Sequence, residues 1–392
     1  MLFSRHIMVL LVVANVMTGA ALATPLIALK EASNCAACHP DGRAQKPVLE
    51  RRCTLDCQGC HIDPNGGGGR NEWGKYYSQT PGQLNMWATM KADDPAVAKK
   101  LISVHTDFRR LIRGQNGKWS TFPMGLDTSV QARPLEKVRL LAGAVLLGKA
   151  NDNLMRIVTD ERRFQERYSV MVDDLPLNTW VRYSKDYPVY GIRRPNHSTW
   201  IRERIGLDQF AQTEAFTIGL TPNVPFARLS YMTGDPAKDE NERQKGTSWH
   251  AGFRGVSYAW HVNASGWNTS SDLAKVDMNA FGAGANFFKF ITYAEVNSRT
   301  VTSNSASATE ATRVHPSSEI SEWTIAYAGL PMTMLGVVAE SMEVNSTSSS
   351  RMNYFVEMHP YQMIQFEIWH RVETGARSLT DDLVSLKLYF DF

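Results

Sequence analysis

Apolar and polar residues alternate in several stretches of the second part of the chain, residues 104–392. In the last stretch, Val384 and Leu386 fall on one side, and Ser385 and Lys387 fall on the other. A period of two residues is typical of β-strands that have one face in an apolar environment. The same alternation is found at 179–185, 226–232, 249–262, 287–296, 323–327 and 364–372. We therefore predict a sheet of many antiparallel strands.

Two architectures are built from many alternating antiparallel strands. A soluble sandwich or barrel turns its apolar faces inward, whereas a membrane barrel turns them outward and keeps a polar lumen. Arg, Lys, Glu and Asp at alternate positions favour the watery lumen. The predicted fold is therefore mainly β: an outer-membrane antiparallel β-barrel of about 14 strands, within a range of about 12 to 16, at roughly 20 residues for each strand and its connection. A soluble β domain is the alternative.

Two stretches rich in Ser, Thr and Asn interrupt this pattern. Residues 301–309 and 345–350 have this composition, which is typical of loops rather than strands. We predict both as loops on the outside of the barrel.

The start of the chain has the pattern of an export signal. Arg5 and His6 precede an apolar run at 7–13, and the sequence at 21–23, Ala-Leu-Ala, fits a small-residue cleavage site. We expect residues 1–23 to be a signal peptide. A membrane anchor is the alternative, but a spanning helix needs about 20 apolar residues, and the run is much shorter.

Composition adds two constraints. The formal net charge of +3 gives no case for a nucleic-acid partner, and the aromatic content of 10% suits a barrel with aromatic girdles. All five cysteines fall within residues 35–60, whereas a disulfide framework would spread over the fold that it crosslinks. This distribution indicates a small cofactor domain, which we assign to residues 24–103 and expect to be built of helices and loops.

The motif Cys-x-x-Cys-His occurs twice in this predicted domain. Cys35, Cys38 and His39 form the first copy, and Cys57, Cys60 and His61 form the second. Two thiols three positions apart reach the two vinyl groups of one haem, and the adjacent imidazole becomes the proximal ligand of the iron. We predict two c-type haems that lie close enough to exchange electrons, because little chain separates the motifs.

Zinc is the main rival to haem at these cysteines. Two Cys-x-x-Cys pairs about 18 residues apart also have zinc-ribbon spacing, and a knot of two disulfides is a further alternative. A zinc ribbon does not need a histidine after each pair, however, and an oxidising compartment disfavours free thiolates. Cys53 belongs to neither motif and is interpreted as a small buried thiol. Arg70 is either a partner for a haem propionate or a solvated surface residue.

The sixth ligands of the two irons are less well defined by the sequence. Met86 and Met90 lie one helical turn apart, and methionine is a common distal ligand. His105, placed ahead of the first predicted strand, is a third candidate. His250 and His261 lie in predicted strands and would be a distal ligand or a relay if they face inward; an ordinary lumen or girdle histidine is the alternative. Core packing of the methionines and an open or water-ligated iron are also compatible with the sequence.

At these residues the chain resembles the cytochrome–porin fusions of Gram-negative outer membranes. The resemblance rests on the second haem motif with its Asp-Pro-Asn-Gly-Gly-Gly tail (57–68, followed by Arg70 and Trp73-Gly74), and on the stretch 180–199. The terminal Phe392 also resembles the signal read by the outer-membrane assembly machinery. The better-studied iron-oxidising fusions have one haem motif, whereas this chain has two.

The resemblance implies that electrons pass across the outer membrane. The haem domain would lie in the periplasm or in the lumen, and the partners would be a periplasmic cytochrome or other redox carrier, an extracellular electron donor or acceptor such as a metal ion or mineral, and outer-membrane lipid. A solute porin with a haem-bearing plug or docking domain is the alternative. A haem enzyme of peroxidase or oxidase type is a second alternative, for which residues 24–103 offer no distal histidine. We therefore expect an electron carrier rather than an enzyme.

Overall fold

The structure is a computed structural model that describes most of the chain from Ile102 onward. The described residues are 102–115, 118–135, 137–147, 164–187, 189–191, 199–207, 211–220, 225–254, 260–287, 290–304, 316–330, 333–361, 364–375 and 378–391. Both Cys-x-x-Cys-His motifs, together with Cys53, Arg70, Met86 and Met90, lie outside the described residues.

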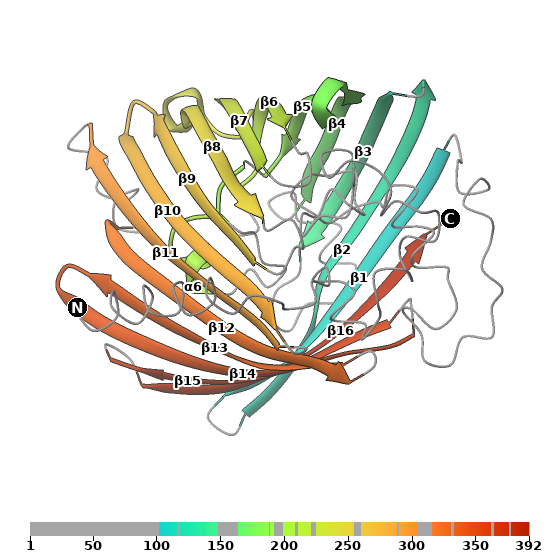
Figure 1. Cartoon of the computed structure of the whole chain (residues 1–392). Coiled ribbons are helices and arrows are strands. Elements are labelled where there is room, and N and C mark those ends of the chain that lie inside the picture. The colour runs from blue at the N-terminus through green and yellow to red at the C-terminus, as the bar shows by residue number, and fades with distance from the viewer. Residues whose placement is uncertain are drawn as a thin grey trace.

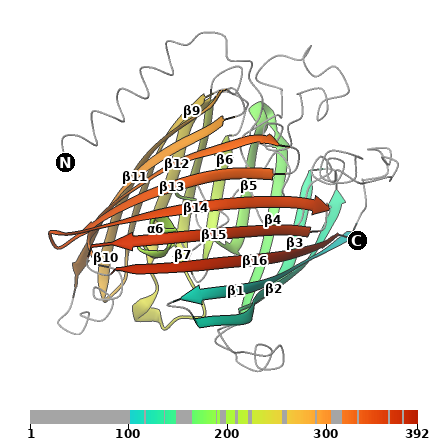
Figure 2. The ribbon, with the colours of Figure 1, turned by 90° about the horizontal axis from the view of Figure 1, so that it is seen from below.

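Within these ranges, sixteen antiparallel strands form one closed barrel (Figures 1 and 2). Each strand pairs with its neighbours in sequence, and the pairing of β1 with β16 closes the ring. The strands are β1 (Ile102–Gln115), β2 (Lys118–Leu135), β3 (Val138–Leu147), β4 (Phe164–Leu175), β5 (Thr179–Asp186), β6 (Thr213–Leu220), β7 (Pro225–Gly234), β8 (Lys245–Arg254), β9 (Trp260–Ser270), β10 (Ala274–Phe287), β11 (Phe290–Ser303), β12 (Ser318–Leu330), β13 (Thr333–Val344), β14 (Thr347–Tyr361), β15 (Ile364–Thr374) and β16 (Leu379–Asp391).

Three short helices lie in the described connections: η5 (Pro176–Asn178), α6 (Trp200–Glu203) and η6 (Glu240–Glu242). None of the helices in the described part of the chain has the length and apolar character needed to cross a bilayer.

The alternation of the sequence sets the two faces of each strand. In β16, Ser385 and Lys387 are buried on the inner face. In the neighbouring β15, Glu367 is buried, whereas Ile368 is 43% exposed on the outer face. The register pairs Glu367 with Ser385, so polar side chains meet polar ones across the strands. Because a shift by one residue would turn all of them outward, this pattern fixes the register.

The connection between β13 and β14 shows how a tight turn follows from the sequence. Asn345 and Ser346 both have positive φ, 48° and 63°. Positive φ at both central residues is the conformation of the two-residue turn that best matches strand twist, and asparagine tolerates it well. The two strands are therefore joined directly, and β14 begins at Thr347.

The connections differ in length between the two ends of the barrel. At one end, which we call the short-turn rim, the strands are joined by segments of at most about five residues, such as 136–137, 255–259 and 362–363. At the other end, the long-loop rim, four connections are much longer: 148–163, 187–212, 235–244 and 304–317. Outer-membrane barrels have short turns on the periplasmic side and long loops outside.

The ends of the barrel sequence lie together at the short-turn rim. β1 begins there at Ile102, and β16 ends there at Asp391, because His105 pairs with Asp391 in the register of these two strands. The chain that precedes Ile102 is therefore joined to the barrel at the short-turn rim.

Large apolar side chains cover the outside of the barrel. Phe216 and Ile218 on β6, Leu229 and Tyr231 on β7, and Tyr354 on β14 are all about half exposed. Further exposed apolar side chains are Ile112, Trp119, Val130, Leu140, Phe164, Val170, Trp249, Phe253, Trp260, Phe281, Phe290, Val296, Trp323, Leu330, Leu335, Met352 and Ile368. A belt of this kind around a closed sheet is the surface that lipid chains would cover.

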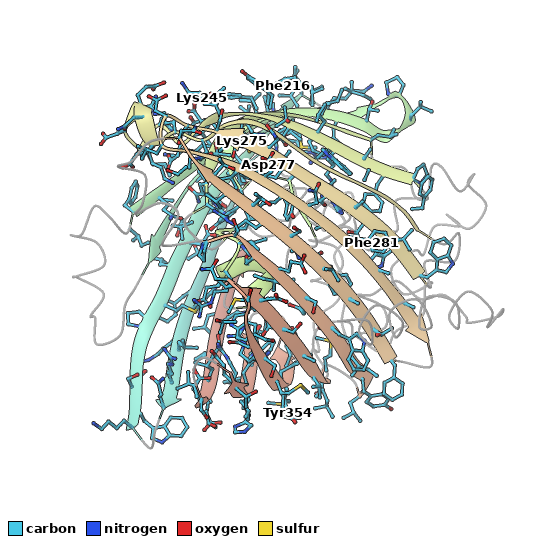
Figure 3. The ribbon with its side chains drawn as sticks, turned by 90° about the vertical axis from the view of Figure 1, so that its left-hand side faces the viewer. Phe216, Lys245, Lys275, Asp277, Phe281 and Tyr354 are labelled. Atoms are coloured by element: carbon cyan, nitrogen blue, oxygen red, sulfur yellow. The ribbon has the colours of Figure 1, made fainter. Side chains whose placement is uncertain are left out.

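The apolar belt ends before the long-loop rim on β10. Figure 3 shows Lys275 and Asp277 near the start of this strand and Phe281 further along it. The Nζ of Lys275 lies 3.0 Å from the Oδ2 of Asp277, and Phe281 is 50% exposed. The outer face thus changes from charged to apolar within four residues, which marks one edge of the belt.

The barrel confirms a mainly β, closed antiparallel fold, with sixteen strands at the upper limit of the predicted range. The structure differs from the finer predictions at several places. The stretches 249–262 and 287–296 each contain the end of one strand and the start of the next, and residues 347–350 belong to β14 rather than to a loop. His105 lies within β1 rather than ahead of the first strand. Of the predicted loop 301–309, residues 301–303 belong to β11.

Candidate functional site

The lumen of the barrel is the candidate site, because buried polar side chains line it. On the wall formed by β3 to β7, Arg139, Arg167, Arg182 and Arg228 are all less than 10% exposed. Burial of charge is costly unless the charge is paired. Arg167 is paired, because its Nη2 donates to Asp127 Oδ1 at 2.7 Å.

Carboxylates line the wall formed by β11 to β13. Glu295 on β11, Glu322 on β12 and Glu340 on β13 are nearly fully buried. In the ring of sixteen strands these positions lie almost opposite the arginines of β3 to β7. Part of this charge is neutralised within its own wall, by Arg351 beside Glu340 and by Asp127 beside Arg167; the remaining opposite charges on facing walls create a field across the lumen, which orients or selects charged species within it.

Part of the connection between β5 and β6, residues 187–212, lies inside the barrel. Its helix α6 lies within the ring of strands in both Figure 1 and Figure 2. Trp200 and Ile201 of this helix, together with Ile205 and Val189, are almost fully buried. We call this stretch the inner segment; residues 188, 192–198 and 208–210 of it are outside the described part of the chain.

Apolar contacts hold the inner segment against the far wall. Tyr190, Trp200, Ile201 and Ile205 form one cluster with residues of β10 and β12. The wall side of this cluster consists of Val276, Met278, Ala280 and Ile320. Burial of one large apolar side chain contributes about 1.5 to 3 kcal/mol, so this cluster fixes the segment across the lumen.

Glu340 provides the main polar anchor of the inner segment. The backbone N–H of Trp200 donates to Oε1 of Glu340. The other carboxylate oxygen accepts hydrogen bonds at 2.7 Å from Nε of Arg351 and from Nδ2 of Asn353. The Arg351 guanidinium also lies 4.7 Å from the centre of the Trp200 ring, a cation–π contact. One carboxylate therefore links β13, β14 and α6.

Two further contacts fix the ends of the inner segment. Nη1 of Arg299 on β11 donates to the backbone oxygen of Ile205. The backbone N–H of Gly191 donates to Oγ of Ser265 at 2.9 Å. Gly191 has a φ of 57°, and a Cβ at this position would lie 2.9 Å from Oε1 of Glu295, so only glycine suits this close approach.

Burial also defines the state of the tyrosine in this segment. Desolvation of the Tyr190 hydroxyl, with a smaller effect from the charge of Glu295, raises its pKa above the ordinary value. The ring of Tyr190 packs edge-on against Trp267, with 6.2 Å between the ring centres. Tyr190 is therefore a neutral packing residue at the point where the segment meets β9.

A separate apolar patch lies on the inner face of β12 to β16. Its residues are Ala326, Val338, Phe355, Trp369 and Leu383. The rings of Phe355 and Trp369 stack with 4.9 Å between their centres. The lumen is thus not uniformly polar, contrary to the simple division into apolar outside and polar inside.

The residues predicted from the sequence as haem ligands fall into three groups. The motif residues Cys35, Cys38, His39, Cys57, Cys60 and His61 and the candidates Met86 and Met90 lie outside the described residues. His105 occupies a position in β1, three residues from its start at the short-turn rim. His250 and His261 both belong to the inner faces of their strands, β8 and β9. Among the described residues there is no group of three His, Cys, Asp or Glu side chains that could hold a metal ion.

The inner segment and its anchors were missed by the analysis of the sequence. Glu340 and Arg351 looked like ordinary lumen residues of alternating strands, and nothing local marks them as partners of Trp200. One signal was present: residues 187–212 lack alternation and combine Trp200 and Ile201 with several arginines. A loop exposed to water does not usually carry such apolar side chains.

Comparison with known proteins extends the description of the fold. No protein-family model matches the chain, and no curated protein matches it. Among solved structures, the chain is similar to a loop-L8 deletion mutant of OmpT, an outer-membrane protein of Vibrio cholerae, with a TM-score of 0.57 and 10% identity over 74% of this chain and 99% of that one.

Two porins are similar to the same extent. OmpF of Salmonella typhi gives a TM-score of 0.55 at 8% identity, over 74% of this chain and 97% of that one. An anion-selective porin from Comamonas acidovorans gives 0.52 at 9% identity, over 74% and 99%. At these identities the likeness shows the fold alone: the closed antiparallel barrel of outer-membrane proteins.

Proposed function

We propose that this chain lies in the outer membrane and passes electrons across it through two covalently bound c-type haems, which a porin-like barrel holds. The observation that carries this proposal is the joining of two features in one chain. Two Cys-x-x-Cys-His motifs precede Ile102 in the sequence, and Ile102 begins a closed barrel at its short-turn rim.

The donor set of the motifs fits haem. Cys35 and Cys38, and likewise Cys57 and Cys60, would form the thioether bonds, and His39 and His61 would be the proximal ligands. Bound there, the two haems would supply reversible one-electron chemistry. On the side of the barrel, His250 and His261 bring two imidazoles to the lumen face, and imidazole is a common axial ligand of haem iron.

The barrel supplies the passage through the bilayer. A hydrocarbon layer insulates charge, whereas a closed barrel with a polar lumen offers a protein-lined path. The inner segment narrows this path because Trp200 and Ile205 are held against β10 and β12. A narrowed lumen suits an electron carrier, because the inner segment then keeps solutes from leaking through the barrel.

The electron balance requires a partner on each side. One electron enters from a reduced donor for each electron that leaves to an oxidised acceptor, so the chain itself is unchanged after each transfer. The periplasmic partner would be a cytochrome or another redox carrier, because short turns mark the periplasmic end. The partner outside would be a metal ion, a mineral or another soluble donor or acceptor.

Proteoliposomes test this proposal. The purified chain, checked for two covalent haems by haem stain after a denaturing gel, is inserted into vesicles that enclose a redox dye. A membrane-impermeant reductant added outside should reduce the enclosed dye. A chain with Cys57→Ala and Cys60→Ala should insert equally well and transfer electrons far more slowly. Absence of covalent haem, or equal rates with both chains, would overturn the proposal.

A solute porin with a haem-bearing plug is the second candidate. The arginines of β3 to β7 and the glutamates of β11 to β13 favour it, because charge on facing walls is suited to selecting ions. The anion-selective porin of Comamonas acidovorans has a similar fold. High ion conductance in planar bilayers, together with no electron transfer in the vesicles, would favour this candidate.

A further inference from the structure

Two histidines and their neighbours form a distinct region of the lumen wall. Phe226 on β7, His250 on β8, His261 and Asn263 on β9, and Tyr293 on β11 belong to the inner face of the five neighbouring strands β7 to β11. All lie in the half of the barrel toward the short-turn rim, except His250, which lies near the middle of β8. We call this region the histidine wall.

His261 is held in a defined orientation. Its ring stacks on Tyr293 with 6.0 Å between ring centres and 19° between ring planes. Gly284 lies beside it in the register of β9 and β10, and a Cβ on Gly284 would lie 3.1 Å from both ring nitrogens of His261. The imidazole thus lies across a position where the wall has no side chain. A ligand imidazole needs such fixed orientation.

Asn263 adds a second, independent sign of a ligand. It is only 2% exposed, and neither its Nδ2 nor its Oδ1 has a hydrogen-bond partner among the described residues. A Cβ on Gly282 would lie 2.9 Å from each of these two atoms, so the amide lies directly over the backbone of a glycine. Buried amide groups without partners are uncommon in folded proteins, which indicates that a polar group from elsewhere meets this wall.

The sequence of the predicted haem domain does not itself supply a second imidazole for either iron. Each Cys-x-x-Cys-His motif supplies one axial ligand, and residues 24–103 contain no histidine besides His39 and His61. A second imidazole for either iron must come from the barrel. Among the histidines whose side chains the structure describes, His370 belongs to the outer face of β15 and is exposed, so only the histidine wall offers one inside.

The chain is long enough to bring the two together. β9 lies eight places from β1 around the ring of sixteen strands, on the opposite wall. About 40 residues separate His61 from Ile102, and at about 3.3 Å for each residue they span more than 100 Å when extended. Since Ile102 lies at the short-turn rim, the second motif can reach the same rim on the far wall.

His261 is better placed than His250 for this role. His250 is 6% exposed and packs edge-on against Phe226 at 5.1 Å between ring centres. In the register of β8 and β9 it lies four residues farther from the short-turn rim than His261, which pairs with Arg254. We propose that His261 is the distal ligand of one of the two haems and that the histidine wall is the docking site of residues 24–101; this inference rests on the proposed function.

Spectroscopy of the full haem-loaded chain tests the inference without any activity assay. In wild type, the haem concerned should be low-spin when oxidised, and it should not bind carbon monoxide when reduced. His261→Gly should convert about half of the haem, one of two, to a high-spin form that binds carbon monoxide. Added imidazole should restore the low-spin spectrum. His370→Gly, on the outer face of β15, is the matched control and should leave the spectrum unchanged.

A second variant keeps the test decisive if His261→Gly does not fold. His261→Met retains a coordinating side chain, and methionine ligation raises the potential of a haem. One of the two midpoint potentials should therefore rise, and the other should stay constant. Equal potentials in His261→Met and wild type would overturn the inference.

The outcomes also separate this inference from the proposed function. A wild-type chain without covalent haem overturns both. Two covalent haems whose spectra are unchanged in His261→Gly overturn the role of His261 and leave the electron-transfer function standing. A spectral change in His250→Gly but not in His261→Gly likewise overturns the assignment to His261.

Discussion

Glu340 shows at the scale of single residues how the lumen wall holds the inner segment. Its side chain accepts hydrogen bonds from Arg351, Asn353 and the backbone of Trp200. In a buried site, the desolvation of a carboxylate is offset only if several donors surround it. The geometry meets this condition with three donors from two elements, β14 and α6.

Replacement of Glu340 should therefore be costly. Glu340→Gln leaves the Arg351 guanidinium buried without its counter-charge, and loss of one partner of a buried pair costs about 3 to 5 kcal/mol. We expect the free energy of unfolding to fall by this amount, measured by urea titration of the folded barrel in lipid. Glu319→Gln, at an exposed position of β12, should change it by no more than about 0.5 kcal/mol. Equal stability of the two variants would contradict the role of Glu340.

The sequence allowed only part of this to be predicted at the residue scale. The side on which Glu367, Ser385 and Lys387 lie follows from alternation and is confirmed by their burial. The partner of Glu340 could not be predicted, because Trp200 is 140 residues away in sequence. A contact between a strand and the inner segment produces no periodic pattern in the sequence of the strand or of the segment.

Among the described connections, the inner segment is the element that occupies part of the lumen. It crosses from the end of β5 to the wall formed by β10 and β12, and α6 presents Trp200 to that wall. Trp200 is fully buried and contacts Arg351 through its ring. Its loss would remove both the apolar and the cation–π contact of the segment.

Trp200→Ala should make the barrel more conductive. Truncation of a buried tryptophan costs about 3 to 5 kcal/mol, and here the cost falls on the attachment of the inner segment rather than on the strands. We expect a larger single-channel conductance in planar bilayers, with an unchanged β-sheet signal by circular dichroism. Trp119→Ala, at a largely exposed position of β2, serves as the control and should leave the conductance as in wild type. A conductance that does not rise in Trp200→Ala would show that other contacts hold the segment.

The position of the apolar belt on the outer face of β10 can be tested by substitution. Phe281 lies at its middle on the outer face, and Asp277 lies toward the long-loop rim (Figure 3). Phe281→Arg should cost about 2 to 4 kcal/mol, because arginine on the lipid face near the midplane is destabilising by this amount. The measurement is the folding free energy in lipid vesicles. Thr300→Arg, on β11 opposite Asp277 in the register, should cost no more than about 1 kcal/mol, and equal costs would place the belt elsewhere.

The strands were largely predictable as elements, and the turns were not. Alternation at 179–185 and 364–372 corresponds to β5 and β15. The alternating stretch 287–296 contains no Gly, Pro or Asp before Phe290 that would mark a turn, yet β10 ends at Phe287 and β11 begins at Phe290. In a closed barrel the strand length is set by the thickness that has to be crossed, so a turn forms where the strand is long enough.

At the scale of the whole molecule, closure of the barrel fixes two opposite ends. The short connections gather at one rim and the long ones at the other, and the β1–β16 pairing brings both ends of the barrel sequence to the short-turn rim. Alternation alone predicted a barrel but not its strand number, because each connection length is free to vary. The haem motifs stay a prediction from sequence, since they lie outside the described residues.

Labelling of intact cells tests the orientation of the two rims. Leu177 in η5 belongs to the short-turn rim and is 73% exposed, whereas Asp239 precedes η6 at the long-loop rim and is also exposed. If long loops face outward, a membrane-impermeant maleimide should label Asp239→Cys on whole cells and should label Leu177→Cys only after the outer membrane is opened. The parent chain, which retains Cys53, gives the background. Labelling of Leu177→Cys on intact cells would reverse the orientation, and it would place the N-terminal haem motifs outside the cell rather than in the periplasm.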